Sequence, residues 1–508
     1  MNIQKKEVGL NLPGPCIRAS AIVDSDAIVN DSKPDLLKII SVDALPRVTK
    51  TEILNGRMMV SGHIVYKVLY QPEGGGGVCS IHTGVDFSHM EENTGFCEGM
   101  YSDVSLWVEH VETELINSRK IKIKSVVAMD VKSEKAGSVL IPVSTDGDNL
   151  VVKKGHISGH SGFLQKRDII SISDALTIPA GKPAVGSLLK TDVSLCNKDI
   201  KVISGKVIIK GEIAICTLYI SETDAGVVCC NHILPFTEIL DAEGLSEEHK
   251  CRVKTEIEEC DFSLATDSEG EVRVINATVR LGVRISADAA VEESIVSDIY
   301  SLTDVMNVEY KTVKLQTAVY HDDFDYSLSG MVRPSGHISS VYNVCAHPEI
   351  TSASARDGKI VMEGYAGISM LCMLQDSSSP VMSHTDEIPF RIEMVAEQAC
   401  GDVKVDWYVE TDSIVCNMNP SGEVELKILL KCSVALMKEE NYVFVDSAES
   451  AGLHSCPTPS MVLYFVQTGD CLWDIAKRYH TKTEYISQLN GDAAEKLVPG
   501  SQLLIPRG

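Results

Sequence analysis

The residues whose types and spacing could do chemistry are few, and two histidines come first. His156 and His160 are four residues apart, the spacing at which two imidazoles on one helix face can bind one metal ion. Gly159 and Gly162 interrupt this stretch, and no acidic or cysteine side chain nearby completes a site, so we expect an exposed loop. The run Gly159-His160-Ser161-Gly162-Phe163 also lacks the final glycine that the turn around a catalytic serine requires.

A histidine and a glutamate each recur once in every third of the chain. They could be metal ligands and general acids of three equivalent sites, or strand-edge histidines and a solvated strand face. No partner carboxylate recurs with the glutamates, so no acid–base pair is assembled. The sequence therefore predicts no catalytic residues, no cofactor and no metal site. The histidines are His82, His232 and His384, and the glutamates are Glu109, Glu256 and Glu410.

Composition restricts the partners this chain can have. Its 508 residues predict three or four domains. With 44% hydrophobic and 23% charged residues, it has the composition of a folded globular protein. A net charge of −25 argues against nucleic acid or an anionic bilayer, because phosphate contacts need clustered Lys and Arg. Residues 460–508 carry five basic and five acidic side chains, so the acidic excess lies in the preceding residues.

The sequence features that indicate a cellular compartment favour the cytoplasm. Residues 1–7 carry charges where a signal peptide needs an apolar segment. No apolar run is long enough to span a bilayer. The 16 cysteines have no regular spacing, which favours reduced thiols in a chain without an export signal.

A repeat of about 150 residues fills the first 440 positions. Its anchor is a turn glycine, then a basic residue, then a second glycine six residues after the first. Gly56 and Gly205 are 149 residues apart, and Gly205 and Gly358 are 153 apart. The second glycines indicate a bulge or a close approach of strands. These second glycines are Gly62, Gly211 and Gly364.

Alternating apolar residues follow each turn, the period of half-buried β-strands. The sequence therefore predicts a mainly β fold of three tandem sandwich-like repeats. Helical periodicity is weak outside the C-terminal tail, apart from a short stretch at 294–305. The expected domains are 1–150, 151–308 and 309–440, then a linker at 441–460 that includes Cys456-Pro-Thr-Pro459, and a small domain at 461–508.

The tail predicts a compact strand–helix–helix–strand (βααβ) domain. Gly469-Asp470 is a turn, and Asp470 is the expected N-cap of the first helix. The positions of Leu472, Ile475, Ala476 and Tyr479 give that helix one apolar face. Asn490-Gly491 should end the second helix, and Pro499-Gly500 should turn the chain into the last strand.

This tail resembles a LysM domain, on the run from Val466 through Ile475-Ala476 and on Pro499-Gly500-x-x-Leu503. The resemblance implies a peptidoglycan-binding fold with a shallow groove for N-acetylglucosamine polymers between two loops. The chain departs from sugar-binding members at Cys471, where they have Thr or Ser, and in the second loop, which lacks Asn-Pro. The groove residues carried over, for a glycan or a protein partner, are Gly469, Asp470, Cys471, Leu472, Trp473, Ala493, Leu497 and Val498.

The three repeats followed by a LysM domain resemble SipL-type spore coat morphogenesis proteins of clostridial endospore formers, which carry three SPOCS repeats. The resemblance implies a sporulation protein in the mother-cell cytoplasm, at the forespore surface. There the LysM domain binds the morphogenetic ATPase of stage IV sporulation, which forms the basement layer of the spore coat.

Two features of the tail could contact a partner. Trp473 either belongs to the small core or contributes its ring to a partner surface. Met461, Val462 and Leu463 extend the apolar run upstream of the usual LysM start, so they either form a partner contact patch or lead in from the third repeat.

We therefore expect a non-enzymatic repeat scaffold that works by protein–protein interaction, with the LysM domain as its docking site. The repeats could self-associate or bind other coat proteins. The alternative is a wall or cortex protein whose LysM domain binds peptidoglycan. A peptidoglycan hydrolase would need a catalytic site that the repeats do not supply.

Overall fold

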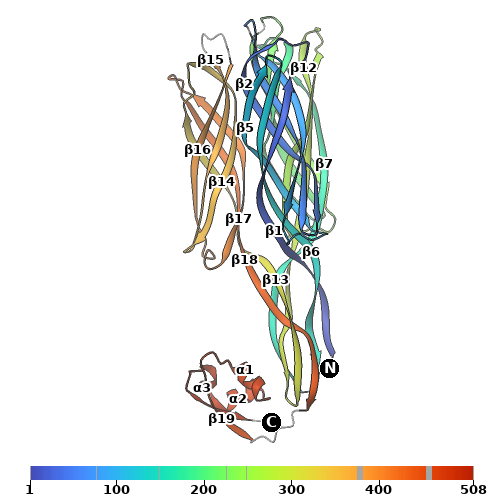
Figure 1. Cartoon of the computed structure of the whole chain (residues 1–508), viewed down its shortest axis with the longest axis vertical. Coiled ribbons are helices and arrows are strands. Elements are labelled where there is room, and N and C mark those ends of the chain that lie inside the picture. Colours follow the sequence, from blue (N-terminus) through green and yellow to red (C-terminus); the bar gives the residue numbers. More distant parts are fainter. Residues whose placement is uncertain are drawn as a thin grey trace.

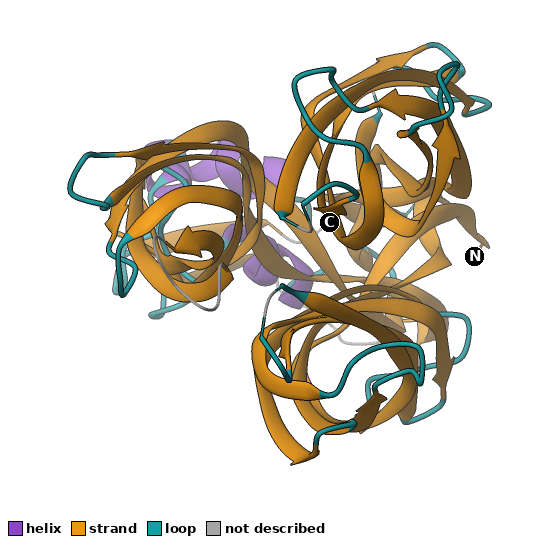
Figure 2. Ribbon diagram, turned by 90° about the horizontal axis from the view of Figure 1, so that it is seen from above, coloured by secondary structure: helices purple, strands orange, loops and turns teal. Residues whose placement is uncertain are grey.

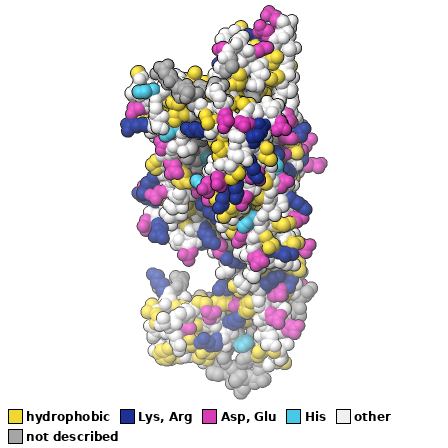
Figure 3. Space-filling model, turned by 45° about the horizontal axis from the view of Figure 1, so that its top comes forward, with side chains coloured by type: hydrophobic (Ala, Val, Ile, Leu, Met, Phe, Trp, Pro, Cys, Tyr) yellow, Lys and Arg dark blue, Asp and Glu magenta, His cyan; other side chains and the backbone are white. Residues whose placement is uncertain are grey.

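The computed structural model of the chain describes residues 2–75, 77–147, 149–224, 226–247, 249–374, 381–453 and 460–506. Three elongated β units lie side by side, long ribbons continue from them, and a small domain with helices lies at the far end (Figure 1). Seen end-on, the strands of each unit wrap in a ring, and the three rings surround a common axis (Figure 2). Basic and acidic side chains are interspersed over the units (Figure 3). The predicted mainly β fold is confirmed.

Each unit contains six strands in the same antiparallel order. The second, third and fourth strands form one three-stranded sheet through two hairpins. The last strand lies between the first and the fifth in a second three-stranded sheet. Alternate side chains from both sheets meet between them, in one apolar cluster in units 2 and 3 and in two in unit 1, the packing of a β-sandwich.

The strand bounds are as follows. Unit 1 contains β1 (Asn2–Ile28), β2 (Leu36–Leu54), β3 (Arg57–Pro72), β4 (Cys79–Glu92), β5 (Tyr101–Asn117) and β6 (Lys120–Asp146). Unit 2 contains β7 (Leu150–Thr177), β8 (Val185–Ile203), β9 (Lys206–Ser221), β10 (Val227–Asp241), β11 (Lys250–Thr266) and β12 (Val272–Ser301). Unit 3 contains β13 (Asp304–Val332), β14 (Ile338–Arg356), β15 (Lys359–Leu374), β16 (Val381–Val395), β17 (Val403–Met418) and β18 (Val424–Leu453).

The three units share even their irregularities. The pairing of the second strand with the third first shifts register after Leu36, Val185 and Ile338. These positions are 149 and 153 residues apart, the same offsets as the turn glycines. Because a bulge re-aims every side chain beyond it, three matching bulges place the same positions of each repeat in its core.

The two glycines of each repeat anchor have different roles. The turn glycines adopt positive φ, 80° at Gly56 and 74° at Gly358, as hairpin turns require. The second glycine lies opposite a phenylalanine on the next strand, as Gly62 does opposite Phe87. A Cβ on Gly62 would lie 2.5 Å from that ring, so the glycine makes room for the aromatic side chain. The other two pairs are Gly211–Phe236 and Gly364–Phe390.

The first and last strands of each unit extend beyond its sandwich as a two-stranded ribbon. In β6, β12 and β18, residues 135–146, 289–301 and 439–453 pair only with the first strand of the unit. The three ribbons, which we call the stalk, pack on one another around Leu10, Ile157, Ile295, Leu315 and Phe444. Ion pairs such as Lys5–Asp446, at 2.7 Å, join ribbons of different units.

The stalk corrects three sequence predictions. Residues 441–453, expected in a linker, belong to β18, and unit 3 begins at Asp304 rather than at 309. The stretch 294–305, where helical periodicity was expected, lies in β12 and β13 because its apolar side chains pack between ribbons. The Cys456-Pro-Thr-Pro459 segment lies outside the described residues.

At the opposite end of the units, a small apolar cluster joins all three. It contains Leu69, Leu218 and Leu371, one from the third strand of each unit. These leucines are again 149 and 153 residues apart, so the same repeat position packs against itself around the common axis. The units are therefore fixed to one another by apolar contacts at both ends.

The Gly62–Phe87 pair gives a test of the repeat fold. We expect Gly62→Ala to destabilise unit 1 by about 1–3 kcal/mol, because the new methyl group overlaps the Phe87 ring. Adding Phe87→Leu should recover part of that loss. Chemical denaturation followed by circular dichroism measures it. Gly181→Ala, at a glycine whose Cβ would meet nothing within 4 Å, is the control. If the two variants lose equal stability, the close approach has no structural role.

Candidate functional sites

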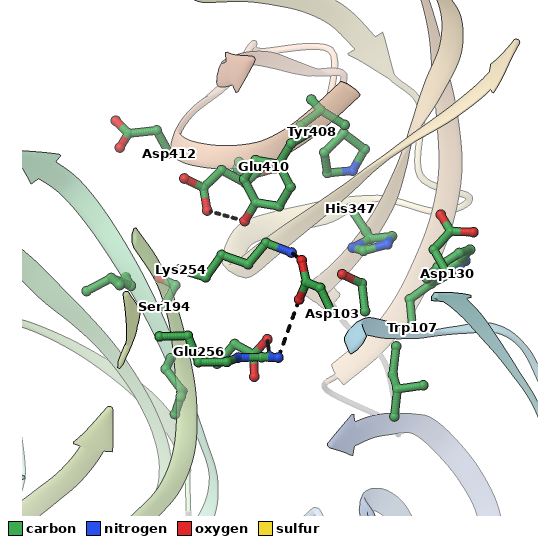
Figure 4. Close-up of a pocket in the computed structure, with 18 of the residues that line it drawn as sticks. Asp103, Trp107, Asp130, Ser194, Lys254, Glu256, His347, Tyr408, Glu410 and Asp412 are labelled. Atoms are coloured by element: carbon green, nitrogen blue, oxygen red, sulfur yellow. Dashed lines mark hydrogen bonds and ion pairs between the residues drawn. The ribbon is translucent and has the colours of Figure 1, made fainter. Parts of the chain in front are cut away.

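A large cavity lies between the three units, along their common axis. It has a volume of about 1950 Å³ and is lined by residues of all three units (Figure 4). Its lining mixes apolar side chains with many charged and polar ones, whereas the clusters at both ends of the units are apolar.

The charges in this cavity pair with one another across unit boundaries. Asp103 of unit 1 forms ion pairs with Lys254 and, at 3.3 Å, with Arg284 of unit 2. Lys198 of unit 2 lies 2.5 Å from Glu410 of unit 3. Lys132 of unit 1 pairs with Asp406 of unit 3. Each pair of units is therefore linked by at least one ion pair.

Burial and neighbouring charges shift the pKa values of several side chains in the cavity. Burial acts to raise the pKa of Asp103, but the neighbouring Lys254 and Arg284 outweigh it, so the pKa lies below its ordinary value. Burial, and then the nearby Glu410, raise the pKa of Tyr408. Burial lowers the pKa of His347, which favours the neutral imidazole. These shifts favour an ionised Asp103 and a neutral Tyr408 and His347.

One of the recurring glutamates considered as general acids lies near a second carboxylate, because Arg284 pairs with both Glu256 and Asp103, but that guanidinium neutralises them. Glu109 is exposed on β5. Glu256 pairs with Arg284 at 2.6 Å, and Glu410 pairs with Lys198. Two of the three are thus used as salt-bridge partners between or within units.

The histidines are placed in strands. His156 and His160 lie on β7, so the expected loop is wrong: this stretch pairs with β12 as part of the stalk. His82 and His232 form hydrogen bonds with the backbone carbonyls of Leu189 and Thr177, at 3.2 and 3.1 Å. Among the residues the structure describes, no cluster of three or more His, Cys, Asp or Glu side chains could hold a metal ion.

The small domain at the end of the chain, which we call the head, spans residues 460–506. Its core contains buried Tyr464, Ile475, Ile486, Leu503 and Ile505. The predicted strand–helix–helix–strand order is present, with a third short helix before the last strand. The elements are β19 (Met461–Phe465), α1 (Leu472–Arg478), α2 (Thr483–Asn490), α3 (Asp492–Glu495) and β20 (Gln502–Pro506).

The first helix of the head begins one residue later than predicted. Its N-cap is Cys471, whose sulfur accepts a hydrogen bond from the backbone N–H of Asp474 at 3.4 Å. Asp470, the expected cap, instead accepts hydrogen bonds from the Tyr464 hydroxyl at 2.6 Å and the Gln467 backbone N–H at 2.8 Å. These bonds lower the pKa of Asp470, so its carboxylate holds the turn before α1.

Backbone hydrogen bonds join the chain segments that flank the two loops of the expected groove. The Val466 N–H donates to the Ser501 carbonyl at 2.9 Å, and the Gly500 N–H donates to the Val466 carbonyl at 2.7 Å. Gly469 and Val498 are exposed. The other groove residues are half-buried, and four of them pack against the head core: Leu472, Trp473, Ala493 and Leu497.

Trp473 lies against the stalk. Its Nε1–H donates to the Asp298 carboxylate at 2.7 Å, and its ring meets Tyr300 edge-to-face with centroids 5.0 Å apart. Lys477 donates to the same carboxylate at 2.6 Å. Burial acts to raise the pKa of Asp298, but its bonds from Lys477, Tyr310 and Trp473 outweigh this and lower it. The tip of unit 2 therefore holds the helical side of the head.

Tyr300 is a member of the head core although it belongs to β12. Its hydroxyl donates to the Thr481 carbonyl at 2.7 Å, and the neighbouring Ser301 carbonyl lies 2.8 Å from His480 Nδ1. No local pattern in the sequence predicts this contact, since it joins residues about 180 positions apart.

A set of apolar side chains covers the outer side of the β19–β20 sheet. Met461, Leu463 and Phe465 are 48%, 51% and 53% exposed, and Leu504, opposite Leu463, is 39% exposed. We call these four residues the apolar face. Hydrophobic side chains gather on the visible side of the head (Figure 3). Of the three patch residues predicted from sequence, Val462 instead packs against the head core, and Phe465 was missed.

Comparison with known families assigns the parts of this chain. Residues 35–116 and 184–265 match the family model described as "SipL, SPOCS domain", and residues 464–506 match the LysM domain model. The chain carries SPOCS and LysM domains. These are non-catalytic domain types, and they relate the chain to the sporulation coat and to a peptidoglycan-binding fold. No curated protein and no solved structure matches it.

The matched SPOCS segments cover corresponding stretches, from just before β2 to β5 in unit 1 and from just before β8 to β11 in unit 2. The match to LysM spans the head from Tyr464 to Pro506. None of the helices in the described part of the chain has the length and apolar composition that crossing a bilayer requires.

The ion pairs between units predict a pH dependence. Because the folded-state pKa of Asp103 lies below the unfolded value of about 4, its carboxylate stabilises the fold above that pH, and the contribution is lost as the pH falls. Thermal unfolding midpoints should therefore fall less between about pH 7 and about pH 3 in Asp103→Asn than in the wild type. Asp323→Asn, at a largely exposed carboxylate, should leave the profile unchanged. An unchanged profile in Asp103→Asn would contradict the assignment.

Head docking depends on Asp298. Asp298→Ala removes the acceptor of the half-buried Trp473 Nε1–H and the carboxylate partner of Lys477, so we expect the head to lose about 1–3 kcal/mol of stability. Urea unfolding followed by Trp473 fluorescence, with Trp107 and Trp407 replaced by Phe, measures this loss. Glu292→Ala, an exposed acid on the same strand, is the control. Equal stability of the two variants would contradict the stabilising role of Asp298.

Proposed function

We propose that this protein is a non-enzymatic scaffold of spore coat assembly whose LysM head binds a protein partner. The partner is the morphogenetic ATPase of stage IV sporulation, at the forespore surface in the mother-cell cytoplasm. The domain matches support the sporulation context. The apolar face of the head is the observation that carries the choice of a protein partner.

The proposal includes a third SPOCS domain in unit 3, as in SipL-type proteins of clostridial endospore formers. The support is structural: unit 3 has the strand order, bulge positions and Gly–Phe pair of the two matched units. We take the domain limits to be those of the units, at 2–146, 150–301 and 304–453.

The apolar face suits a protein better than a sugar. Four neighbouring apolar side chains are each more than a third exposed. Covering them with an apolar partner surface releases water and so favours binding. Acetamido sugars need hydrogen-bond donors and acceptors. At the groove, the Cys471 sulfur is used as a helix cap, and Asp470 is bonded to Tyr464 and Gln467.

The body supports a structural role. Ion pairs link charged side chains in and beside the central cavity, and the recurring glutamates of the body are ion-pair partners or exposed. Such a body positions the head at the end of the stalk, and its outer strands offer edges for self-association or for other coat proteins.

The apolar face predicts the outcome of a binding experiment. In the full chain, Leu463→Ser and Phe465→Ser together should weaken binding to the purified ATPase at least tenfold, because about half of each side chain is exposed for contact. Surface plasmon resonance measures this. The control is Ile233→Ser, a similar change at an exposed isoleucine of unit 2, which should bind as the wild type does. Undiminished binding by the double variant would refute the proposed docking surface.

The alternative is a peptidoglycan-binding wall or cortex protein, which the LysM match favours. The groove residues would then contact N-acetylglucosamine chains. Sedimentation of the full chain with purified peptidoglycan separates the two functions. Binding that is lost on Asp470→Ala or Leu472→Ala, in a chain that does not bind the ATPase, would establish the glycan function instead.

A further inference from the structure

The two edges of the head's small sheet differ in whether another group hydrogen-bonds to their backbone. The sheet contains only β19 and β20 among the described residues. The outer edge of β20 is occupied by a side chain: Asn490 of α2 donates to the Leu504 carbonyl and accepts from the Leu504 N–H, both at 2.7 Å. Asn490 thus takes the place that the backbone of a third strand would have.

These two bonds fix which backbone groups of β19 point outward. Since the N–H and C=O of Leu504 point away from β19, the pair Leu463–Leu504 is a non-hydrogen-bonded pair of the antiparallel ladder. The N–H and C=O of Leu463 must therefore point away from β20 as well. The same holds two residues away, at Met461 and Phe465.

The loop contacts agree with this assignment. Val466 exchanges hydrogen bonds with Gly500 and Ser501, on the side of β20. Val466 has the opposite parity to Leu463, so Val462 and Tyr464 are the residues of β19 whose backbone faces β20. The outer edge of β19 then presents the N–H and C=O groups of three residues, which are also the residues whose side chains form most of the apolar face.

This edge lacks the features that protect the other edges of the molecule. Edge strands of the units carry charges that oppose pairing with another chain, such as Glu112 and Glu114 on β5 and Glu258 and Glu259 on β11. The five residues of β19 are Met-Val-Leu-Tyr-Phe, with no charge, no proline and no bulge. An uncharged edge strand with exposed apolar side chains fits pairing with an uncharged partner strand.

We propose that the protein partner of the head binds by adding a β-strand to the outer edge of β19, which pairs with no other strand among the described residues. This inference rests on the proposed function and specifies how that site binds. The occupant is an extended segment of the partner, about five residues long to match β19. It hydrogen-bonds to the backbone of Met461, Leu463 and Phe465 and carries uncharged, apolar side chains on the side of the apolar face.

The test separates the backbone bonds from the side chains. In the full chain, Leu463→Pro removes one outward N–H that is not part of the β19–β20 ladder, a change that an edge strand tolerates. We expect its affinity for the purified ATPase to fall about tenfold. Leu463→Val keeps the N–H and an apolar side chain, and should bind as the wild type does. Trp473 fluorescence confirms in each variant that the head remains folded against the stalk.

A second measurement does not depend on a substitution. In hydrogen exchange of the wild-type chain, adding the ATPase should slow exchange of the amides of Met461, Leu463 and Phe465. The amides of Val462 and Tyr464, which already face β20, should change little. Exchange that is unchanged at the three outward amides would overturn the strand addition.

The remaining outcomes are distinct from failure of the proposed function. If Leu463→Pro binds normally while the Leu463→Ser, Phe465→Ser variant does not, the head binds the ATPase through side chains alone and strand addition is wrong. If neither binds more weakly than the wild type, the proposed docking surface is wrong. If the chain alone forms dimers that Leu463→Pro abolishes, the occupant is a second copy of this chain, and the proposed partner strand is overturned.

Discussion

The pairing of the first strand of each unit with its last is the constraint on which the rest of the structure depends. These pairs extend past the sandwiches as ribbons, and a single partner strand cannot bury the apolar side chains of a ribbon. The three ribbons therefore pack on one another, with Leu10, Ile157, Ile295, Leu315 and Phe444 at their centre. That packing fixes the three units around one axis and creates the tip on which the head rests.

The position of the head follows from this arrangement. The tip of β12, in unit 2, supplies Tyr300 to the head core and Asp298 to Trp473 and Lys477. The head follows unit 3 in the chain but docks on unit 2, so it is placed by the assembled stalk. With its helical side held there, the head offers the β19–β20 side for binding, which matches a scaffold that displays one docking surface at its end.

Local and repeated signals were enough to predict much of this fold. Gly56 and Gly358 predicted the hairpins, because a turn that needs positive φ at one position favours glycine there, whatever the distant contacts are. The turn glycines recur after 149 and 153 residues, and similar strand patterns follow each of them. This repetition predicted three sandwich-like units. The βααβ order of the head followed from helix periodicity and from Asn490-Gly491, where α2 does end.

Other features could not be predicted, because they depend on contacts distant in sequence. Alternation alone does not show that a strand continues past its sandwich, so 441–453 was assigned to a linker. Gly62 and Phe87 were both visible as repeated residues, but only the register pairs them. Asp470 rather than Cys471 was expected to cap α1 because carboxylates cap more often than thiols. The partners of Trp473 lie on β12, about 175 residues earlier in the chain, so the residues next to Trp473 do not predict them.

The central claim is that the head binds a protein through β19 rather than a glycan through the groove. Photo-crosslinking in sporulating cells tests it most directly, with a photoreactive amino acid placed at position 463 in one chain and at position 472 in another. We predict a crosslink from position 463 to the coat ATPase. Crosslinks from position 472 to peptidoglycan, with none from position 463 to the ATPase, would contradict the account.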